Sequence, residues 1–85
     1  MPDLPDMPDS QDDKAHHLDT TGLNCPLPVL KTRRMLETLP KGAKLQVSAS
    51  DPMAAIDLPH FCTTAGYTLH RQWEADGVFY FEIGK

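Results

Sequence analysis

Cysteine is scarce in this sequence: Cys25 and Cys62 are the only two among 85 residues. Two cysteines do not make the disulfide framework of a small secreted domain, and the N-terminus lacks the basic start and apolar run of a secretory signal. No apolar stretch approaches the roughly 20 residues that are needed to cross a bilayer. We therefore expect a cytoplasmic protein whose two thiols stay reduced.

The sequence also has too few suitably spaced ligands for a zinc site. Zinc sites normally need four well-spaced ligands, and the pairs His16 with His17 and His60 with Cys62 offer no such set. We therefore expect no metal site, and no bound cofactor.

An excess of positive charge is missing as well. Nucleic-acid binders usually show one, whereas the only basic cluster here is formed by Lys31, Arg33 and Arg34, and the formal net charge is −4. Direct binding of nucleic acid is therefore disfavoured.

The net negative charge comes from the N-terminus. Residues 1–15 hold five Asp and one Lys, which leaves seven of the twelve acidic and seven of the eight basic residues for 16–85. Prolines recur every third residue from Pro2 to Pro8, a pattern that neither a helix nor a central strand tolerates. We predict a disordered acidic tail over 1–15, which is either a solubilising extension or a docking arm for a basic partner, and one folded domain over 16–85. A domain of this size has no room for a deep substrate cavity.

The folded part predicts six elements. A short strand over 17–21 and a turn at 22–24 precede a helix that begins at Pro26 and stops at 40–42. A strand over 44–49 follows, then a helix from about residue 52 that Gly66 ends, and a hairpin of strands 67–74 and 78–83 around the turn signal Asp76-Gly77. Ser50 or Asp51 is expected to cap the second helix, and Pro59 inside it implies a kink or two short helices.

Apolar periodicity assigns the buried faces. The first helix should bury one stripe and the second another, while alternate residues of the last strand point to the core. The stripes are Val29, Thr32, Met35, Leu36 and Leu39; Ala54, Ala55, Leu58, Phe61, Cys62 and Ala65; and Phe79, Phe81 and Ile83. Because β-α-β crossovers are right-handed in nearly all cases, both helices should cover one face. The prediction is an α/β (α+β) two-layer sandwich of order β-α-β-α-β-β, with a four-stranded mixed sheet whose second face, with Val78 and Tyr80, stays open.

Cys25 lies where turn residues give way to the first helix, in the run Cys25-Pro26-Leu27-Pro28. Pro26 and Pro28 are tolerated in a first helical turn because its N–H groups lack partners there, so they stiffen the helix start and fix where the sulphur points. The free N–H groups and the helix dipole should favour the thiolate and lower the pKa of Cys25. Cys25 would then be a nucleophile that needs no neighbouring base; the alternative is a buried, structural cysteine.

Two leucines and three basic residues lie on the outward side of the first helix. A surface helix usually shows only polar residues on that side, so Leu27, Leu30, Lys31, Arg33 and Arg34 are predicted to form a docking patch for a partner protein, unless they are a solvated face with scattered leucines. Cys62 falls on the apolar side of the second helix and is predicted to be structural.

The segment from Leu18 to Thr32, which contains the Cys-Pro-x-Pro element, resembles the TusA family (also called SirA-like) of sulphur carriers. The resemblance extends to Ala49-Ser50-Asp51-Pro52, to Asp57-Leu58-Pro59 and to Phe61-Cys62, and covers about residues 17 to 84.

The resemblance implies sulfurtransferase activity through a persulfide. Cys25 would receive sulphane sulphur from a cysteine desulfurase or a rhodanese-like protein and hand it to an acceptor protein. The pathway is left open among thiolation of transfer RNA, molybdenum cofactor assembly and sulphur oxidation. The same resemblance makes Pro26 and Pro28 positioning residues, Lys31 and Arg34 docking charges, and Asp51 a helix cap.

Two other functions compete with sulphur transfer. A non-catalytic regulatory or interaction module could use the same helix face, and a thiol-redox protein would require Cys62 to reach Cys25. The chain is expected to be a monomer or a weak dimer, since the open sheet face permits self-association.

Overall fold

The computed structural model describes residues 15–85, so the predicted acidic tail lies outside the described residues except for Ala15. The elements follow in the predicted order. They are β2 (Ala15–Thr20), α2 (Leu27–Thr38), β3 (Lys44–Ala49), α3 (Ala54–Ala65), β4 (Thr68–Ala75) and β5 (Val78–Gly84). The first strand begins two residues earlier than predicted and ends one earlier.

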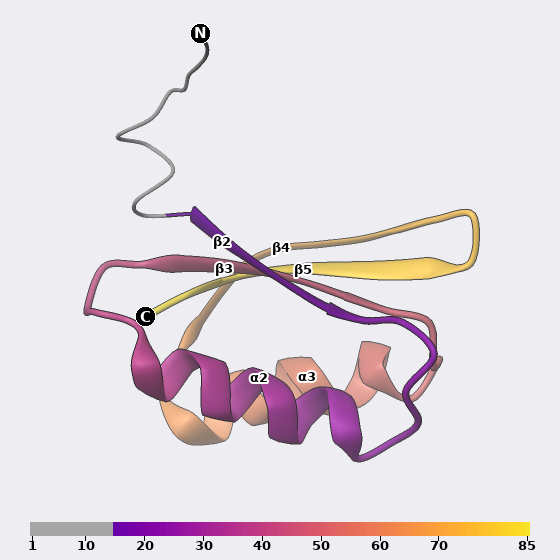
Figure 1. Ribbon diagram of the computed structural model, residues 1–85, viewed down its shortest axis with the longest axis horizontal. Helices are drawn as coiled ribbons and strands as arrows, with labels where there is room; N and C mark the ends of the chain where they lie inside the picture. The colour runs from indigo at the N-terminus through magenta and orange to yellow at the C-terminus, as the bar shows by residue number, and fades with distance from the viewer. Residues whose placement is uncertain (1–14) are drawn as a thin grey trace, which may run out of the picture.

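The four strands form one mixed sheet in the order β2-β3-β5-β4. β2 and β3 are parallel, and both β3 with β5 and β4 with β5 are antiparallel. Figure 1 shows α2 and α3 side by side under one face of this sheet. The predicted two-layer α/β sandwich is therefore confirmed.

The core lies between the sheet and the two helices. From β3 and β5 it takes the alternate residues that the period of two assigns to one face: Leu45, Val47, Ala49, Phe81 and Ile83, each fully buried, with Phe79 packed at the edge. In β2 the residues paired with that face, Leu18 and Thr20, point the same way. The alternation of residues along the strands was thus enough to predict which residues of the sheet form the core.

α2 begins at Leu27, so Pro26 is the N-cap residue rather than the first helical one, and Pro28 lies in the first turn. The predicted stripe faces the core: Thr32 and Leu36 are fully buried, and Val29 and Met35 pack against the cluster. The helix ends at Thr38, and Leu39 is extended and donates its N–H to Leu36 O. Pro40 then makes continuation impossible.

α3 is one helix from Ala54 to Ala65, not the two short helices that Pro59 made an alternative. Proline cannot donate to the carbonyl four residues earlier, and here that carbonyl, Ala55 O, accepts a hydrogen bond from Gln72 Nε2 of β4 at 3.2 Å. Tertiary structure thus replaces the bond that the proline removes. Ala65, predicted on the apolar face, is exposed in the last turn of the helix, directly before Gly66.

Backbone conformation ends α3 and turns the hairpin. Gly66 takes the left-handed conformation, with φ of 84°, and its N–H bonds Cys62 O, as at many helix C-termini. Asp76 and Gly77 have φ of 53° and 80°, the two positive values of a tight hairpin turn. Neither α2 nor α3 is long and apolar enough to cross a membrane.

The second face of the sheet carries an aromatic pair. Trp73 of β4 and Tyr80 of β5 are cross-strand partners whose rings stack with centroids 5.3 Å apart. The Arg71 guanidinium lies 4.5 Å from the Trp73 ring centroid. These contacts stabilise the hairpin on the face of the sheet that neither α2 nor α3 covers.

Candidate functional site

Cys25 lies in the short connection between β2 and α2, two residues before the helix, and is exposed. The Cys25–Pro26 peptide bond is cis. Leu27 N–H bonds Asn24 O at 2.8 Å, which closes a tight turn around the cysteine. The exposed thiol agrees with the sequence-based expectation and not with the alternative of a buried structural cysteine.

Asp51 fixes the backbone of Cys25. Its Oδ2 accepts the Cys25 N–H at 2.7 Å, and its Oδ1 accepts the Met53 N–H at 3.0 Å. Asp51 therefore caps the turn that leads into α3, whereas α3 itself, with Met53 at its N-cap, has no side-chain cap. The same carboxylate ties the β3–α3 connection to the β2–α2 connection, a role that the prediction of a simple helix cap did not include.

Asp57, in the first turn of α3, contacts the sulphur directly. Cys25 Sγ donates a hydrogen bond to Asp57 Oδ2 over 2.9 Å. Asp57 is half-buried, and its own N–H bonds Met53 O within the helix. The sulphur is thus held between the start of α2 and the first turn of α3.

These carboxylates overturn the expected acidity of Cys25. The pKa of the thiol is raised, first because Asp57 accepts a hydrogen bond from its protonated form, then through desolvation and the negative charges of Asp57 and Asp51. The helix start supplies little to oppose them, since Pro26 and Pro28 have no N–H and Leu27 donates its own to Asn24 O. The predicted lowering of the pKa is wrong, and Cys25 has a potential base in contact.

Sequence reasoning missed Asp57 as a site residue. It precedes Leu58 at the edge of the apolar stripe of α3, and it belongs to the Asp57-Leu58-Pro59 run that carries part of the family resemblance. Those two signals mark the residue, but only the packing of α3 beside α2 brings its carboxylate to the sulphur.

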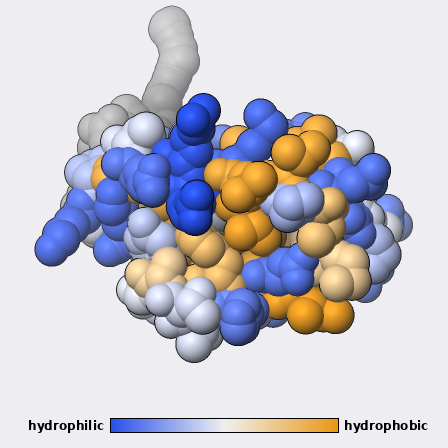
Figure 2. Space-filling view, turned by 90° about the horizontal axis from the view of Figure 1, so that it is seen from below, coloured by the Kyte–Doolittle hydropathy of each residue, from blue (hydrophilic) through white to orange (hydrophobic). Residues whose placement is uncertain are grey.

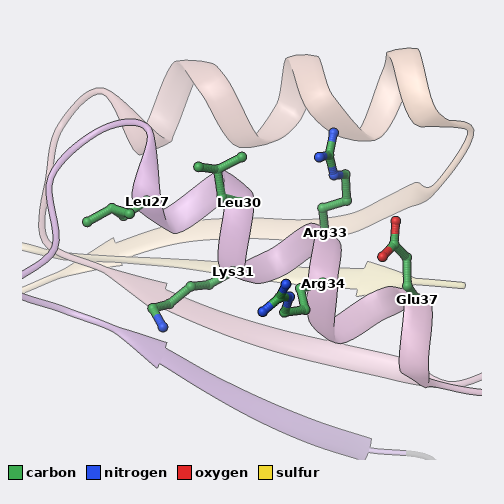
Figure 3. A pocket seen from close by; sticks show the side chains of 6 residues that line it. All are labelled: Leu27, Leu30, Lys31, Arg33, Arg34 and Glu37. Atoms are coloured by element: carbon green, nitrogen blue, oxygen red, sulfur yellow. The ribbon is translucent and has the colours of Figure 1, made fainter.

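The predicted docking residues lie together on the outer side of α2. Leu27 and Leu30 are 43% and 45% exposed, and with Lys31, Arg33, Arg34 and Glu37 they line a surface hollow of about 370 Å³. Lys31 and Arg34 point to the β2 side of the helix, whereas Leu30 and Arg33 point toward α3 (Figure 3). Figure 2 shows apolar surface directly beside hydrophilic surface on this helical side of the molecule.

A second hollow continues this surface toward the sheet edge. It lies between α2 and β2 and is lined by Leu18, Lys31, Arg34, Met35 and Thr38. Lys31 and Arg34 thus border both hollows.

Cys62 lies in the core. It is 2% exposed, and burial raises the pKa of its thiol to about 11. Within residues 15–85 no three His, Cys, Asp or Glu side chains gather in a way that could hold a metal ion.

Comparisons with known proteins agree on one family. The sequence model described as "Sulfurtransferase TusA" matches residues 16–85. A relative in Pseudomonas putida, "Sulfur carrier protein TusA", is 43% identical over 68 residues, which is 80% of this chain and 85% of the relative. One of the same name in Pseudomonas paraeruginosa is 41% identical over 68 residues, 80% of this chain and 86% of the relative.

A solved structure supports the fold. The crystal structure of the SirA-like protein from Desulfitobacterium hafniense superposes with a TM-score of 0.72, at 24% identity, over 81% of this chain and 95% of that one. At that identity the likeness concerns the fold alone.

Proposed function

Because the chain belongs to the TusA family, we propose that it is a sulphur carrier that accepts sulphane sulphur as a persulfide on Cys25 and passes it to an acceptor protein. The observation that carries the proposal is the exposed Cys25 thiol at the start of α2. The other thiol, Cys62, is buried in the core and is out of reach of a protein donor.

The outer side of α2 is the proposed docking surface for donor and acceptor. Leu27 and Leu30 supply apolar area next to the thiol, and Lys31, Arg33 and Arg34 supply positive charge. A basic rim attracts an acidic partner surface and speeds the encounter, while the leucines exclude water once contact is made. Pro26 and Pro28 have no freedom in φ and therefore keep Cys25 at the edge of this surface.

The partners are proposed by class. The donor is a cysteine desulfurase or a rhodanese-like protein, and the acceptor is a protein of transfer RNA thiolation, molybdenum cofactor assembly or sulphur oxidation. The carrier would act in the cytoplasm as a monomer or weak dimer, with no metal and no cofactor besides the sulphur on Cys25. The buried position of Cys62 favours this function over thiol-redox chemistry, which needs both thiols.

A two-step transfer tests the proposal. The protein is first incubated with a cysteine desulfurase and cysteine, then freed of the donor and mixed with a thiol acceptor. Wild type and Cys62→Ser should gain sulphur in the first step and lose it in the second, whereas Cys25→Ser should do neither. Sulphur uptake by Cys25→Ser at the wild-type level would refute the proposal.

A further inference from the structure

A hydrogen bond of 2.9 Å joins Cys25 Sγ to Asp57 Oδ2. This bond favours the protonated thiol, whereas sulphur transfer needs the thiol to lose its proton. The thiolate is the nucleophile in such exchange. A carboxylate beside the sulphur opposes its ionisation, as the raised pKa of Cys25 reflects. The reactive form is therefore rare at neutral pH unless the proton leaves during the attack itself.

We propose that Asp57 is a catalytic residue that accepts the Cys25 proton while the sulphur attacks the donor. The inference rests on the proposed function, because it assigns a role within sulphur transfer at Cys25. The distance of 2.9 Å is within the range required of a general base.

The step balances without an oxidant or reductant. Cys25 Sγ attacks the outer sulphur of a donor persulfide R–S–S–H and forms a new S–S bond, while the thiol proton passes to Asp57 Oδ2. The donor S–S bond breaks with its electron pair on the inner sulphur, which takes the proton from Asp57. The products are Cys25–S–S–H and R–S–H.

Transfer of the sulphur from Cys25 to an acceptor follows the same steps in the opposite direction. An acceptor thiol R′–S–H attacks the outer sulphur, Asp57 takes its proton, and the same carboxyl protonates Cys25 Sγ as the bond to it breaks. Protonation is needed because a thiol with a raised pKa is a poor leaving group as the thiolate.

Asp51 and Asp57, the two carboxylates next to Cys25, have different roles. Both oxygens of Asp51 accept backbone N–H groups, from Cys25 and from Met53, at 2.7 and 3.0 Å. Asp51 therefore positions the cysteine and does not touch the sulphur. Among residues 15–85 only Asp57 Oδ2 bonds the reacting atom. Asp57 is half-buried and Cys25 is exposed, so the thiol stays accessible to a donor.

The test compares sulphur loading with plain reactivity of the thiol. Loading by glutathione hydropersulfide is followed by mass, and alkylation by iodoacetamide is followed in parallel. Asp57→Asn should load at least about tenfold more slowly at pH 7, since general base catalysis typically contributes a factor of about 10² or more. Its alkylation should become faster, because removing the carboxylate lowers the pKa of Cys25 and raises the thiolate fraction.

The controls isolate the carboxylate. Asp76→Asn makes the same chemical change at the hairpin turn and should load like wild type, and Asp57→Glu, which keeps the acid, should recover part of the rate. Asp57→Asn loading as fast as wild type, or faster in parallel with alkylation, would overturn the inference and leave the proposed function standing. A wild type that gains no sulphur would remove the proposed function, and the inference with it.

The pH dependence of wild-type loading tests the role of Asp57 as a base even if Asp57→Asn does not fold. Proton transfer to Asp57 makes wild-type loading, divided by the fraction of donor present as R–S–S–H, nearly independent of pH from neutral pH up to the pKa of the thiol. If only free thiolate reacts, the loading rate divided by the fraction of donor present as R–S–S–H must rise about tenfold per pH unit in that range, and that result would refute a role for Asp57 as base.

Discussion

Thr20 and Thr32 are both fully buried, yet only one of the two hydroxyls has a partner. Thr20 Oγ1 donates to Ser48 O at 2.7 Å, whereas Thr32 Oγ1 has no hydrogen-bond partner among the described residues. A buried polar group without a partner costs free energy that an apolar group of the same shape does not.

Valine substitutions at these two positions should therefore have opposite effects. Thr32→Val should raise the free energy of unfolding by about 1 kcal/mol, and Thr20→Val should lower it by about 1 kcal/mol, because it removes the hydrogen bond to Ser48 O. Urea unfolding of both variants measures the difference. A loss of stability in both would mean that Thr32 Oγ1 is satisfied in solution.

Cys62 links stability to pH. Burial raises the pKa of its thiol from an ordinary 9.0 to about 11, so the folded state keeps a proton that the unfolded state loses. Its contribution to stability is complete below pH 9 and is lost as the pH rises to about 11. The difference in unfolding free energy between wild type and Cys62→Ala should shrink over that window, since Cys25 is common to both. A constant difference from pH 8 to 11 would contradict the assignment.

At Cys25 the sequence predicted the place of the thiol and mispredicted its chemistry. Exposure followed from local residues, because Cys25 precedes Pro26 and Pro28 at a helix start. The direction of the pKa shift did not, because it depends on Asp57, 32 positions away, whose carboxylate meets the sulphur only after α3 packs beside α2.

At the scale of the elements, α3 contains Pro59, and a side chain of the adjacent strand β4 replaces the hydrogen bond that this proline removes. Pro59 leaves Ala55 O without its helical donor, and Gln72 of β4 donates to that oxygen. The bond connects the helix to the edge strand of the sheet and lets α3 run unbroken to Ala65.

A double-mutant cycle should reveal this compensation. Gln72→Ala should cost about 1 kcal/mol in the wild type. It should cost clearly less in Pro59→Ala, because the alanine N–H can then bond Ala55 O. Gln46→Ala, a glutamine on β3, is the matched control, and equal costs of Gln72→Ala in both backgrounds would disprove the coupling.

Element boundaries were predictable where local chemistry dictates them. Gly66 ends α3 in the left-handed conformation, and Asp76-Gly77 turns the hairpin as their residue types indicate. The unbroken α3 was not predictable with certainty, since a sequence shows the proline but not the glutamine that compensates for it.

At the scale of the molecule, Lys85 joins the segment after β5 to α2. Lys85 Nζ donates to Leu36 O and Leu39 O at 2.6 and 2.7 Å, at the negative end of the α2 dipole. The Lys85 N–H also bonds Ala43 O. These bonds connect β5, α2 and the loop before β3.

Lys85→Met should lower the free energy of unfolding by about 1 to 2 kcal/mol, because two carbonyls lose a charged donor. Lys41→Met changes an exposed lysine in the loop after α2 and should have little effect. Thermal unfolding of the two variants provides the comparison, and equal melting temperatures would argue against a structural role of Lys85.

Periodicity and handedness were enough to predict the layers of the molecule, because Leu45, Val47, Phe81 and Ile83 alternate strictly and the helices must bury their stripes against them. The docking surface was predictable as a set of residues on α2. Its extension along β2 through Leu18 was not, since it arises from the packing of a helix on a strand.

The central claim is that sulphur travels on Cys25, and the position of the added atom tests it most directly. After loading by a cysteine desulfurase and cysteine, the peptide that contains Cys25 should be heavier by about 32 Da, the mass of one sulphur atom, and a reductant should reverse the gain. The peptide that contains Cys62 should be unchanged. An unmodified Cys25 peptide, or sulphur found only on Cys62, would contradict the account.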